Sequence, residues 1–171
     1  HVEAAVMAMI ETPARRDQNI AVFGLGVSGI ATANALARSG AHVTAWDDGA
    51  AARETASAQG VNLSDPRKTG LSGMDALVLS PGIPLTHPKP HQVVELAQDA
   101  ECPVIGDIEL LVEARPDATY IAITGTNGKS TTTALIGHVL ESSGLEIAIG
   151  GNLGPPALSL DPLGAGGIYV L

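Results

Sequence analysis

The chain has few aromatic residues and a single cysteine. Aromatic residues make up only 2% of its 171 residues, whereas hydrophobic residues make up 45%, so the core must be built from Ala, Val, Ile and Leu. Cys102 has no second cysteine with which to form an internal disulfide bond, which fits a reducing cytosol. We therefore expect a cytoplasmic protein in which Cys102 is an inert, packed thiol.

Basic residues are also scarce. Lys and Arg number 9 against 18 Asp and Glu, so the formal net charge is −9. Nucleic-acid binding requires a basic patch, and membrane insertion requires a long apolar run; the sequence has neither. We therefore expect no nucleic-acid partner and no membrane insertion. A small nucleotide is still compatible, because local glycine loops can hold phosphates inside an acidic protein.

The strongest motif is a glycine-rich loop in the last third of the chain. Residues 124–132 read Thr-Gly-Thr-Asn-Gly-Lys-Ser-Thr-Thr and directly follow the apolar run 120–123. A strand followed by such a loop and a helix is typical of a phosphate loop for a nucleoside triphosphate and Mg²⁺. The predicted phosphate ligands are Gly125, Thr126, Asn127, Gly128, Lys129, Ser130 and Thr131. Lys129 is the predicted catalytic charge, and the hydroxyl of Ser130 is the predicted metal ligand.

The spacing of this loop departs from the general pattern. Gly125 and Gly128 are separated by two residues, whereas the common loop has four residues before its Gly-Lys pair. A short glycine loop before a helix can be only a turn. The Lys-Ser-Thr-Thr sequence at the start of the helix, directly after a β-branched strand, argues against that alternative.

A second glycine motif lies about a hundred residues earlier. The predicted strand 19–23 is followed by Gly-Leu-Gly-Val-Ser-Gly at 24–29, which opens a helix running to about Ser39. The next predicted strand, 42–46, ends at Asp47, 18 positions after the last glycine. This βαβ unit has the fingerprint of a dinucleotide-binding domain and taken alone suggests NAD. The alternative is that its glycines only allow close packing of helix and strand.

The remaining predicted elements alternate between strands and helices. Further strands are expected at 75–79, 103–105, 120–123, 146–149 and 168–171, and further helices at 50–59, 90–100, 108–114 and after Lys129. This alternation predicts an α/β fold with a mainly parallel sheet. Ser80-Pro81-Gly82 form a turn at the carboxyl end of strand 75–79, the edge at which open α/β sheets bind ligands.

Two local details are also predicted. Asp107 is expected to cap the helix 108–114. In the helix after the phosphate loop, the spacing predicts a core stripe of Leu135, Ile136, Val139 and Leu140. His87 and His91 are four residues apart, but prolines interrupt the span, so we expect unliganded loop histidines.

Arg115-Pro116-Asp117 interrupts the pattern and predicts a domain boundary. We expect a first domain over 18–116 and a second domain over 117–171. Residues 1–17, which begin with His rather than Met, are expected to be an N-terminal extension or a remnant left by cloning.

The motifs in this order resemble the Mur ligases of peptidoglycan synthesis. The compact loop 125–131 is similar to the ATP loop of that family, which accounts for its short spacing. Within the family, the motifs at 24–29, 80–84, 106–110 and 150–154 resemble the branch that adds D-glutamate. The resemblance covers about residues 18 to 171. The branch that adds L-alanine would be expected to have His in place of Asn127.

The resemblance implies a Rossmann-like, parallel-sheet domain that binds UDP-N-acetylmuramoyl-L-alanine rather than NAD, followed by the start of a P-loop α/β ATPase domain. The implied UDP-substrate residues are Gly24, Gly26, Val27, Ser28, Gly29, Asp47, Ser80, Pro81, Gly82, Gly151 and Asn152. Asp47 would contact the uracil. The family often has Thr-Arg after this aspartate, and Asp48-Gly49 stand there in this chain, so an expected basic contact is missing.

The implied reaction is amide formation driven by ATP and Mg²⁺. The γ-phosphoryl group passes to the alanyl carboxylate to give an acyl phosphate, and the amine of D-glutamate then displaces phosphate. The resemblance also implies a cytoplasmic, monomeric parent enzyme of three domains, of which this chain would be an inactive fragment with a truncated ATPase domain. The alternatives are an L-alanine-adding Mur ligase, an NAD-binding Rossmann oxidoreductase and a nucleotide-sensor module.

Overall fold

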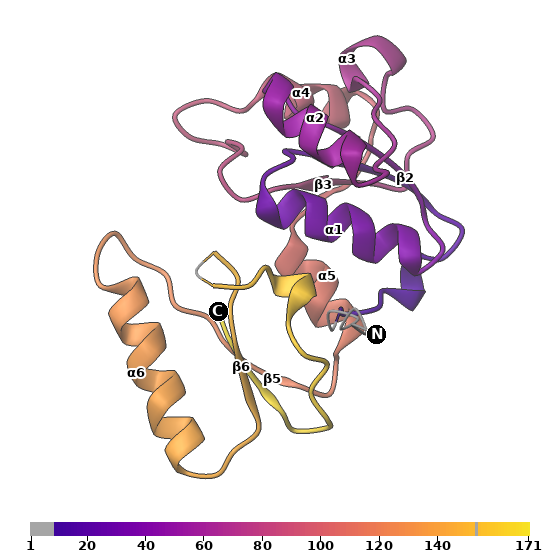
Figure 1. The fold of residues 1–171 in the computed structure, drawn as a ribbon. Helices are drawn as coiled ribbons and strands as arrows, with labels where there is room; N and C mark the ends of the chain where they lie inside the picture. The colour runs from indigo at the N-terminus through magenta and orange to yellow at the C-terminus, as the bar shows by residue number, and fades with distance from the viewer. Residues whose placement is uncertain (1–8, 153) are drawn as a thin grey trace.

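The computed structural model describes residues 9–152 and 154–171. It contains two parallel β-sheets flanked by helices, so the predicted α/β fold is confirmed (Figure 1). The first sheet has the strand order β2-β1-β3-β4, and the second has the order β5-β7-β6. Residues 1–8 of the predicted extension and Leu153 of the predicted 150–154 motif lie outside the described residues. None of the described helices is both long and apolar enough to cross a membrane.

The first unit follows the predicted alternation closely. After a short 3₁₀ turn η1 (Pro13–Arg15), its elements are β1 (Asn19–Phe23), α1 (Val27–Arg38), β2 (His42–Trp46), α2 (Ala50–Ala58), α3 (Pro66–Thr69), β3 (Ala76–Leu79), α4 (Gln92–Asp99), β4 (Val104–Ile105) and α5 (Asp107–Ala114). The one-turn helix α3 was not predicted. It begins after Asp65, whose carboxylate accepts the backbone N–H of Arg67.

The second unit is built around the phosphate loop. Its elements are β5 (Thr119–Ile121), α6 (Lys129–Ser142), β6 (Ile147–Ile149), the 3₁₀ turn η2 (Ala157–Ser159) and β7 (Ile168–Val170). The change from one sheet to the other falls between Ala114 and Thr119, where the boundary was predicted. That the two units are independent domains stays a prediction.

Strand β1 is buried on both of its faces. Ile20 and Val22 belong to one apolar cluster, and Ala21 and Phe23 belong to another, as the two-residue period of a strand requires. Helices α1 and α5 contribute to the first cluster and α4 contributes to the second. Burial of both faces explains why the two central strands, β1 and β3, consist almost entirely of apolar residues.

The two units pack against each other. The first apolar cluster continues into the second unit through Leu158 of η2 and Tyr169 of β7. The backbone N–H of Ile10 donates a 2.9 Å hydrogen bond to the carbonyl oxygen of Leu158. The hydroxyl of Tyr120 donates a 2.8 Å hydrogen bond to the carbonyl oxygen of Arg115, just after α5. Residues 9–12, the strand β5 and the end of α5 therefore join the units.

The predicted cap of α5 is wrong. Asp107 is the first residue of the helix, and Gly106, with an extended backbone, is its N-cap. The carboxylate of Glu109 accepts the backbone N–H of Gly106 at 2.9 Å, which is one half of a capping box. Asp107 is instead only 4% exposed.

The predicted core stripe of α6 is wrong for two of its four residues. Leu135 and Val139 are 61% and 54% exposed, whereas Thr133 and Gly137 are buried. A Cβ atom on Gly137 would lie 2.2 Å from the Cδ1 atom of Ile149 in β6. The helix therefore approaches the sheet through its smallest residue, and this turns Leu135 and Val139 towards solvent.

Candidate functional site

A cavity of about 530 Å³ lies at the carboxyl ends of β1, β2 and β3. It is lined by Gly24, Gly26, Val27, Ser28, Gly29, Asp47, Ser80, Pro81, Gly82, Ile83, Gly151, Asn152, Gly154 and Pro156. Every residue that the sequence predicts for the UDP substrate is in this set, although those residues come from four separate segments. The volume lies in the range of small-molecule sites, and the position is the edge at which open α/β sheets bind ligands.

The glycine motif shapes the floor of this cavity. Gly24 has a φ of +95°, which favours glycine. A Cβ atom on Gly29 would lie 1.7 Å from the carbonyl oxygen of Gly24. The hydroxyl of Ser80, at the end of β3, donates to that same oxygen at 2.7 Å. Glycine at position 29 is therefore required by close packing, whatever ligand the cavity binds.

The N-terminus of α1 opens onto the cavity. Its N-cap, Gly26, provides no side-chain hydrogen bond, and the first turn holds no acidic residue. The first N–H groups of a helix have no partner within the helix, and together with the helix dipole they favour an anion. Val27 and Ser28 present these groups at the cavity wall, so this wall suits a diphosphate.

Asp47 lies at the end of β2 with its carboxylate held by two backbone groups. It accepts the N–H of Leu25 at 2.6 Å and the N–H of Gly49 at 2.7 Å. An ionised carboxylate has about four acceptor positions, so two remain for a ligand. The carboxylate therefore orders the turn after β2 and can still accept a hydrogen bond from a base or a ribose.

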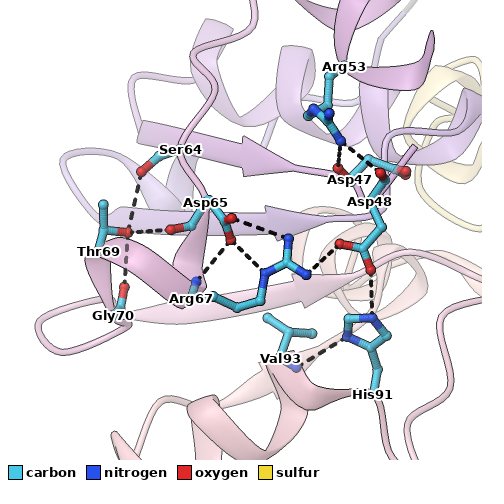
Figure 2. A network of polar contacts seen from close by, with 10 residues as sticks. All are labelled: Asp47, Asp48, Arg53, Ser64, Asp65, Arg67, Thr69, Gly70, His91 and Val93. Atoms are coloured by element: carbon cyan, nitrogen blue, oxygen red, sulfur yellow. Dashed lines mark hydrogen bonds and ion pairs between the residues drawn. The ribbon is translucent and has the colours of Figure 1, made fainter. Parts of the chain in front are cut away.

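Two arginines surround the Asp47-Asp48 turn, and neither was predicted (Figure 2). Arg53 donates from Nη1 to the carbonyl oxygens of Asp47 and Asp48, both at 2.8 Å, and its guanidinium carbon lies 4.7 Å from the ring centre of Trp46. Arg67 lies with Nη1 2.9 Å from the Asp48 carboxylate. Arg53 lies on α2 and Arg67 on α3, so no sequence spacing relative to Asp47 predicts their contacts with this turn.

A second, mainly apolar cavity of about 890 Å³ adjoins the first. It lies along α1 and α2, with Ile30 and Ala52 among its lining residues, and it shares Gly26, Val27, Gly154 and Pro156 with the first cavity. Val27 is 78% exposed beside both cavities. A nucleotide bound at the start of α1 would therefore have apolar surface next to it.

The phosphate loop has the form expected for a nucleotide. Gly128, with a φ of +75°, is the N-cap of α6, and no acidic residue lies in the first turn. The ammonium group of Lys129 donates to the carbonyl oxygen of Gly125, and the side chains of Ser130 and Thr131 are exposed. Free N–H groups and a cation suit the phosphates of ATP, and a hydroxyl oxygen can provide one ligand to a Mg²⁺ ion that the phosphates also bind, so these residues fit both.

An acidic metal site does not accompany the loop within the part of the chain that the structure describes. There, no three His, Cys, Asp or Glu side chains gather in a way that could hold a metal ion. That the hydroxyl of Ser130 is a metal ligand stays a prediction from the motif.

The phosphate loop and the cavity wall share one edge of the second sheet. The N–H of Ile123 donates to the carbonyl oxygen of Leu171 at 2.8 Å, and the N–H of Gly150 donates to that of Val170 at 3.1 Å. The loop after β5 and the Gly151-Asn152 turn after β6 therefore flank the end of β7. None of the predicted ATP-phosphate residues lines the cavity described above.

The remaining predicted features have structural roles. Cys102 is buried, and burial raises the pKa of its thiol, in line with an inert group. His91 is the N-cap of α4 and accepts the N–H of Val93 through Nδ1. Its Nε2 atom lies 3.0 Å from the Asp48 carboxylate.

Residues 18–106 match the family described as Mur ligase MurD-like, N-terminal domain. The chain is also similar to enzymes named UDP-N-acetylmuramoylalanine–D-glutamate ligase. It is 52% identical over 167 residues to that of Rhizobium etli, 52% over 163 residues to that of Paramagnetospirillum magneticum, and 48% over 167 residues to that of Brucella abortus. In each case the match covers 95% of this chain and 36% of the relative, so the chain spans about a third of the length of these relatives.

A solved structure is similar at a lower level. The crystal structure of UDP-N-acetylmuramate-alanine ligase MurC from Thermotoga maritima is 18% identical, with a TM-score of 0.49, over 89% of this chain and 36% of that chain.

Proposed function

Because the chain belongs to the Mur ligases with a MurD-like N-terminal domain, we propose that it is the UDP-substrate-binding part of an ATP-dependent ligase that adds D-glutamate to UDP-N-acetylmuramoyl-L-alanine. The observation that carries the proposal is the cavity of about 530 Å³, because one space collects every residue predicted for that substrate. The names of the relatives support the choice of D-glutamate as the second substrate.

The walls of the cavity suit the parts of a UDP-sugar. The N-terminus of α1, at Val27 and Ser28, binds the diphosphate through its free N–H groups. The remaining acceptor positions of Asp47 take the N–H group of the uracil ring. The Ser80–Gly82 turn and Asn152 line the space for the sugar.

Residues 125–131 bind the ATP phosphates and Mg²⁺ in this proposal. ATP supplies the phosphoryl group that activates the alanyl carboxylate, so that the amine of D-glutamate can form the amide. Lys129 and the first N–H groups of α6 stabilise negative charge at the transferring group, and Ser130 holds the metal ion. The parent enzyme is expected to be a cytoplasmic monomer.

The test is a substrate-dependence assay on the parent protein encoded by the same gene. The proposal predicts phosphate release from ATP only when UDP-N-acetylmuramoyl-L-alanine and D-glutamate are both present. Release with UDP-N-acetylmuramate and L-alanine instead would favour the L-alanine-adding ligase. NAD reduction would favour an oxidoreductase, and nucleotide binding without any turnover would favour a sensor module.

A further inference from the structure

We propose that Asp48 and His91 are positioning residues for the nucleotide cavity, which they hold in shape without lining it. This inference rests on the proposed function, because the cavity is taken to be the UDP site. The hydrogen bond between the two side chains links the turn after β2, which carries Asp47, to the loop after β3, which carries Gly82. Strand β1 lies between those two strands, so the link spans the middle of the sheet edge.

The two neighbouring aspartates have separate tasks. The Asp47 carboxylate lines the cavity and accepts N–H groups of Leu25 and Gly49. The Asp48 carboxylate is not among the residues that line the cavity. Its Oδ1 atom lies 2.9 Å from Nη1 of Arg67, and its Oδ2 atom lies 3.0 Å from Nε2 of His91 (Figure 2). Asp48 directly follows Asp47, and both belong to the turn after β2.

His91 is held from three sides. Its Nδ1 atom accepts the backbone N–H of Val93 at 3.2 Å, so the proton of the neutral ring is on Nε2, which donates to Asp48. Its backbone N–H donates to the carbonyl oxygen of Pro84 at 2.9 Å, which closes the loop 84–91 two residues after Gly82. Its ring centre lies 4.7 Å from that of Phe23, the last residue of β1.

Arg67 completes the link by balancing charge. Its Nε atom lies 2.9 Å from the carboxylate of Asp65, and its Nη1 atom contacts Asp48. The Arg67 guanidinium, chiefly by its side-chain hydrogen bond, holds the pKa of the Asp65 carboxyl below its ordinary value. An unbalanced carboxylate at Asp48 would add repulsion beside a diphosphate site; the contact with Arg67 offsets that charge.

Loss of the Asp48–His91 link should therefore loosen the cavity wall at Gly82 relative to Asp47. We expect UDP to bind about 3- to 30-fold more weakly, the usual range for residues that act on a site without touching its ligand. Neither side chain lines the cavity, so the substitutions should act on UDP affinity through the shape of the cavity wall.

Two substitutions of His91 separate this role from its role as a helix cap. His91→Asn keeps a good N-cap for α4 but is too short to reach Asp48. His91→Gln keeps a side chain long enough to donate to Asp48 but caps poorly. Asp48→Ala removes the link from the other end. Glu95→Gln, an exposed residue in the first turn of α4, is the matched control.

The experiment measures the Kd for UDP by calorimetry and the Tm for each variant of the 171-residue chain. The inference predicts weaker binding with a nearly unchanged Tm for His91→Asn, and near-normal binding with a lowered Tm for His91→Gln. The double variant Asp48→Ala/His91→Asn should bind UDP no more weakly than the weaker-binding of the two single variants, because both substitutions remove the same Asp48–His91 hydrogen bond. Equal UDP affinity in His91→Asn and the wild type, or additive losses in the double variant, would overturn the inference.

A second measurement needs no ligand. In the free chain, His91→Asn and Asp48→Ala should shift the NMR amide resonance of Gly82, and Glu95→Gln should not. An unchanged Gly82 resonance would overturn the positioning role even if UDP proved not to be the ligand. Failure of the wild type to bind UDP, with a shifted Gly82 resonance, would instead count against the proposed function alone.

Discussion

The hydroxyl of Ser80 donates a 2.7 Å hydrogen bond to the carbonyl oxygen of Gly24, so the end of β3 is fastened to the end of β1 inside the cavity. Gly29, at the start of α1, packs against both groups: a Cβ atom there would lie 2.6 Å from the Ser80 hydroxyl oxygen. The cavity floor thus depends on contacts between the 24–29 motif and Ser80, which lies 56 residues after Gly24.

Gly29→Ala should therefore destabilise the chain. The added methyl group would collide with the Gly24 carbonyl and force the backbone apart, at a cost of about 1–3 kcal/mol in the free energy of unfolding. Urea unfolding of the 171-residue chain measures this. Gly26→Ala is the matched control, because a Cβ atom on Gly26 meets nothing within 4 Å and its φ is −71°. Equal stability of the two variants would contradict the packing described here.

The exposed face of α6 should tolerate polar substitution. Leu135→Gln should change the free energy of unfolding by no more than about 0.5 kcal/mol, because this side chain is 61% exposed. Leu111→Ala should lower the free energy of unfolding by about 2–5 kcal/mol, because Leu111, on α5, is fully buried in the core. Urea unfolding compares the two variants. A large loss of unfolding free energy in Leu135→Gln would mean that α6 packs through the predicted stripe that includes Leu135.

Asp107 should make stability depend on pH. Burial raises the pKa of its carboxyl, so the folded chain holds this proton more tightly than the unfolded chain does. The contribution of this carboxyl to the free energy of unfolding is therefore fully present below its pKa in the unfolded chain, about 3.9, and is lost as the pH rises through its pKa in the folded chain. Asp107→Asn removes the titration, so the difference in Tm between variant and wild type should be more positive at pH 7.5 than at pH 4. A pH-independent difference for Asp107→Asn would contradict the prediction.

Lys129→Ala should impair catalysis in the parent enzyme and spare the UDP site. Removal of one preorganised group that stabilises charge costs about 10²-fold or more in turnover. The Kd for UDP-N-acetylmuramoyl-L-alanine should change little, because Lys129 does not line the cavity. Steady-state kinetics and calorimetry measure the two quantities. A variant with near-normal turnover would show that Lys129 is not at the transferring phosphate.

The sequence predicts the cavity well because its residues follow local rules. Gly24–Gly29 and Asp47 stand at fixed positions of a βαβ unit, and the Ser80–Gly82 turn ends a buried strand. In a parallel sheet, such carboxyl ends necessarily meet at one edge. The order of elements and the turn residues thus account for bringing Gly24–Gly29, Asp47 and Ser80–Gly82 together, whereas their role and the contribution of Gly151 and Asn152 were implied by the resemblance to the Mur ligases.

The contacts around that cavity could not be predicted in the same way. Arg67 and His91 reach Asp48 from α3 and from the cap of α4, and no periodicity relates such positions. The predicted core face of α6 was wrong for a related reason. The spacing of apolar residues favoured the face with the larger side chains, but the close approach of Gly137 to Ile149 determines which face meets the sheet. Both depend on tertiary packing, which a pattern of apolar residues does not contain.

The most direct test of the central claim is calorimetric titration of the 171-residue chain with UDP-N-acetylmuramoyl-L-alanine and, separately, with NAD. The UDP-sugar should bind more tightly than NAD. Asp47→Ala should also weaken UDP-sugar binding by about 1–3 kcal/mol, because the base loses its acceptor. Tighter binding of NAD, or unchanged UDP-sugar affinity in Asp47→Ala, would show that the cavity is not a UDP-sugar site.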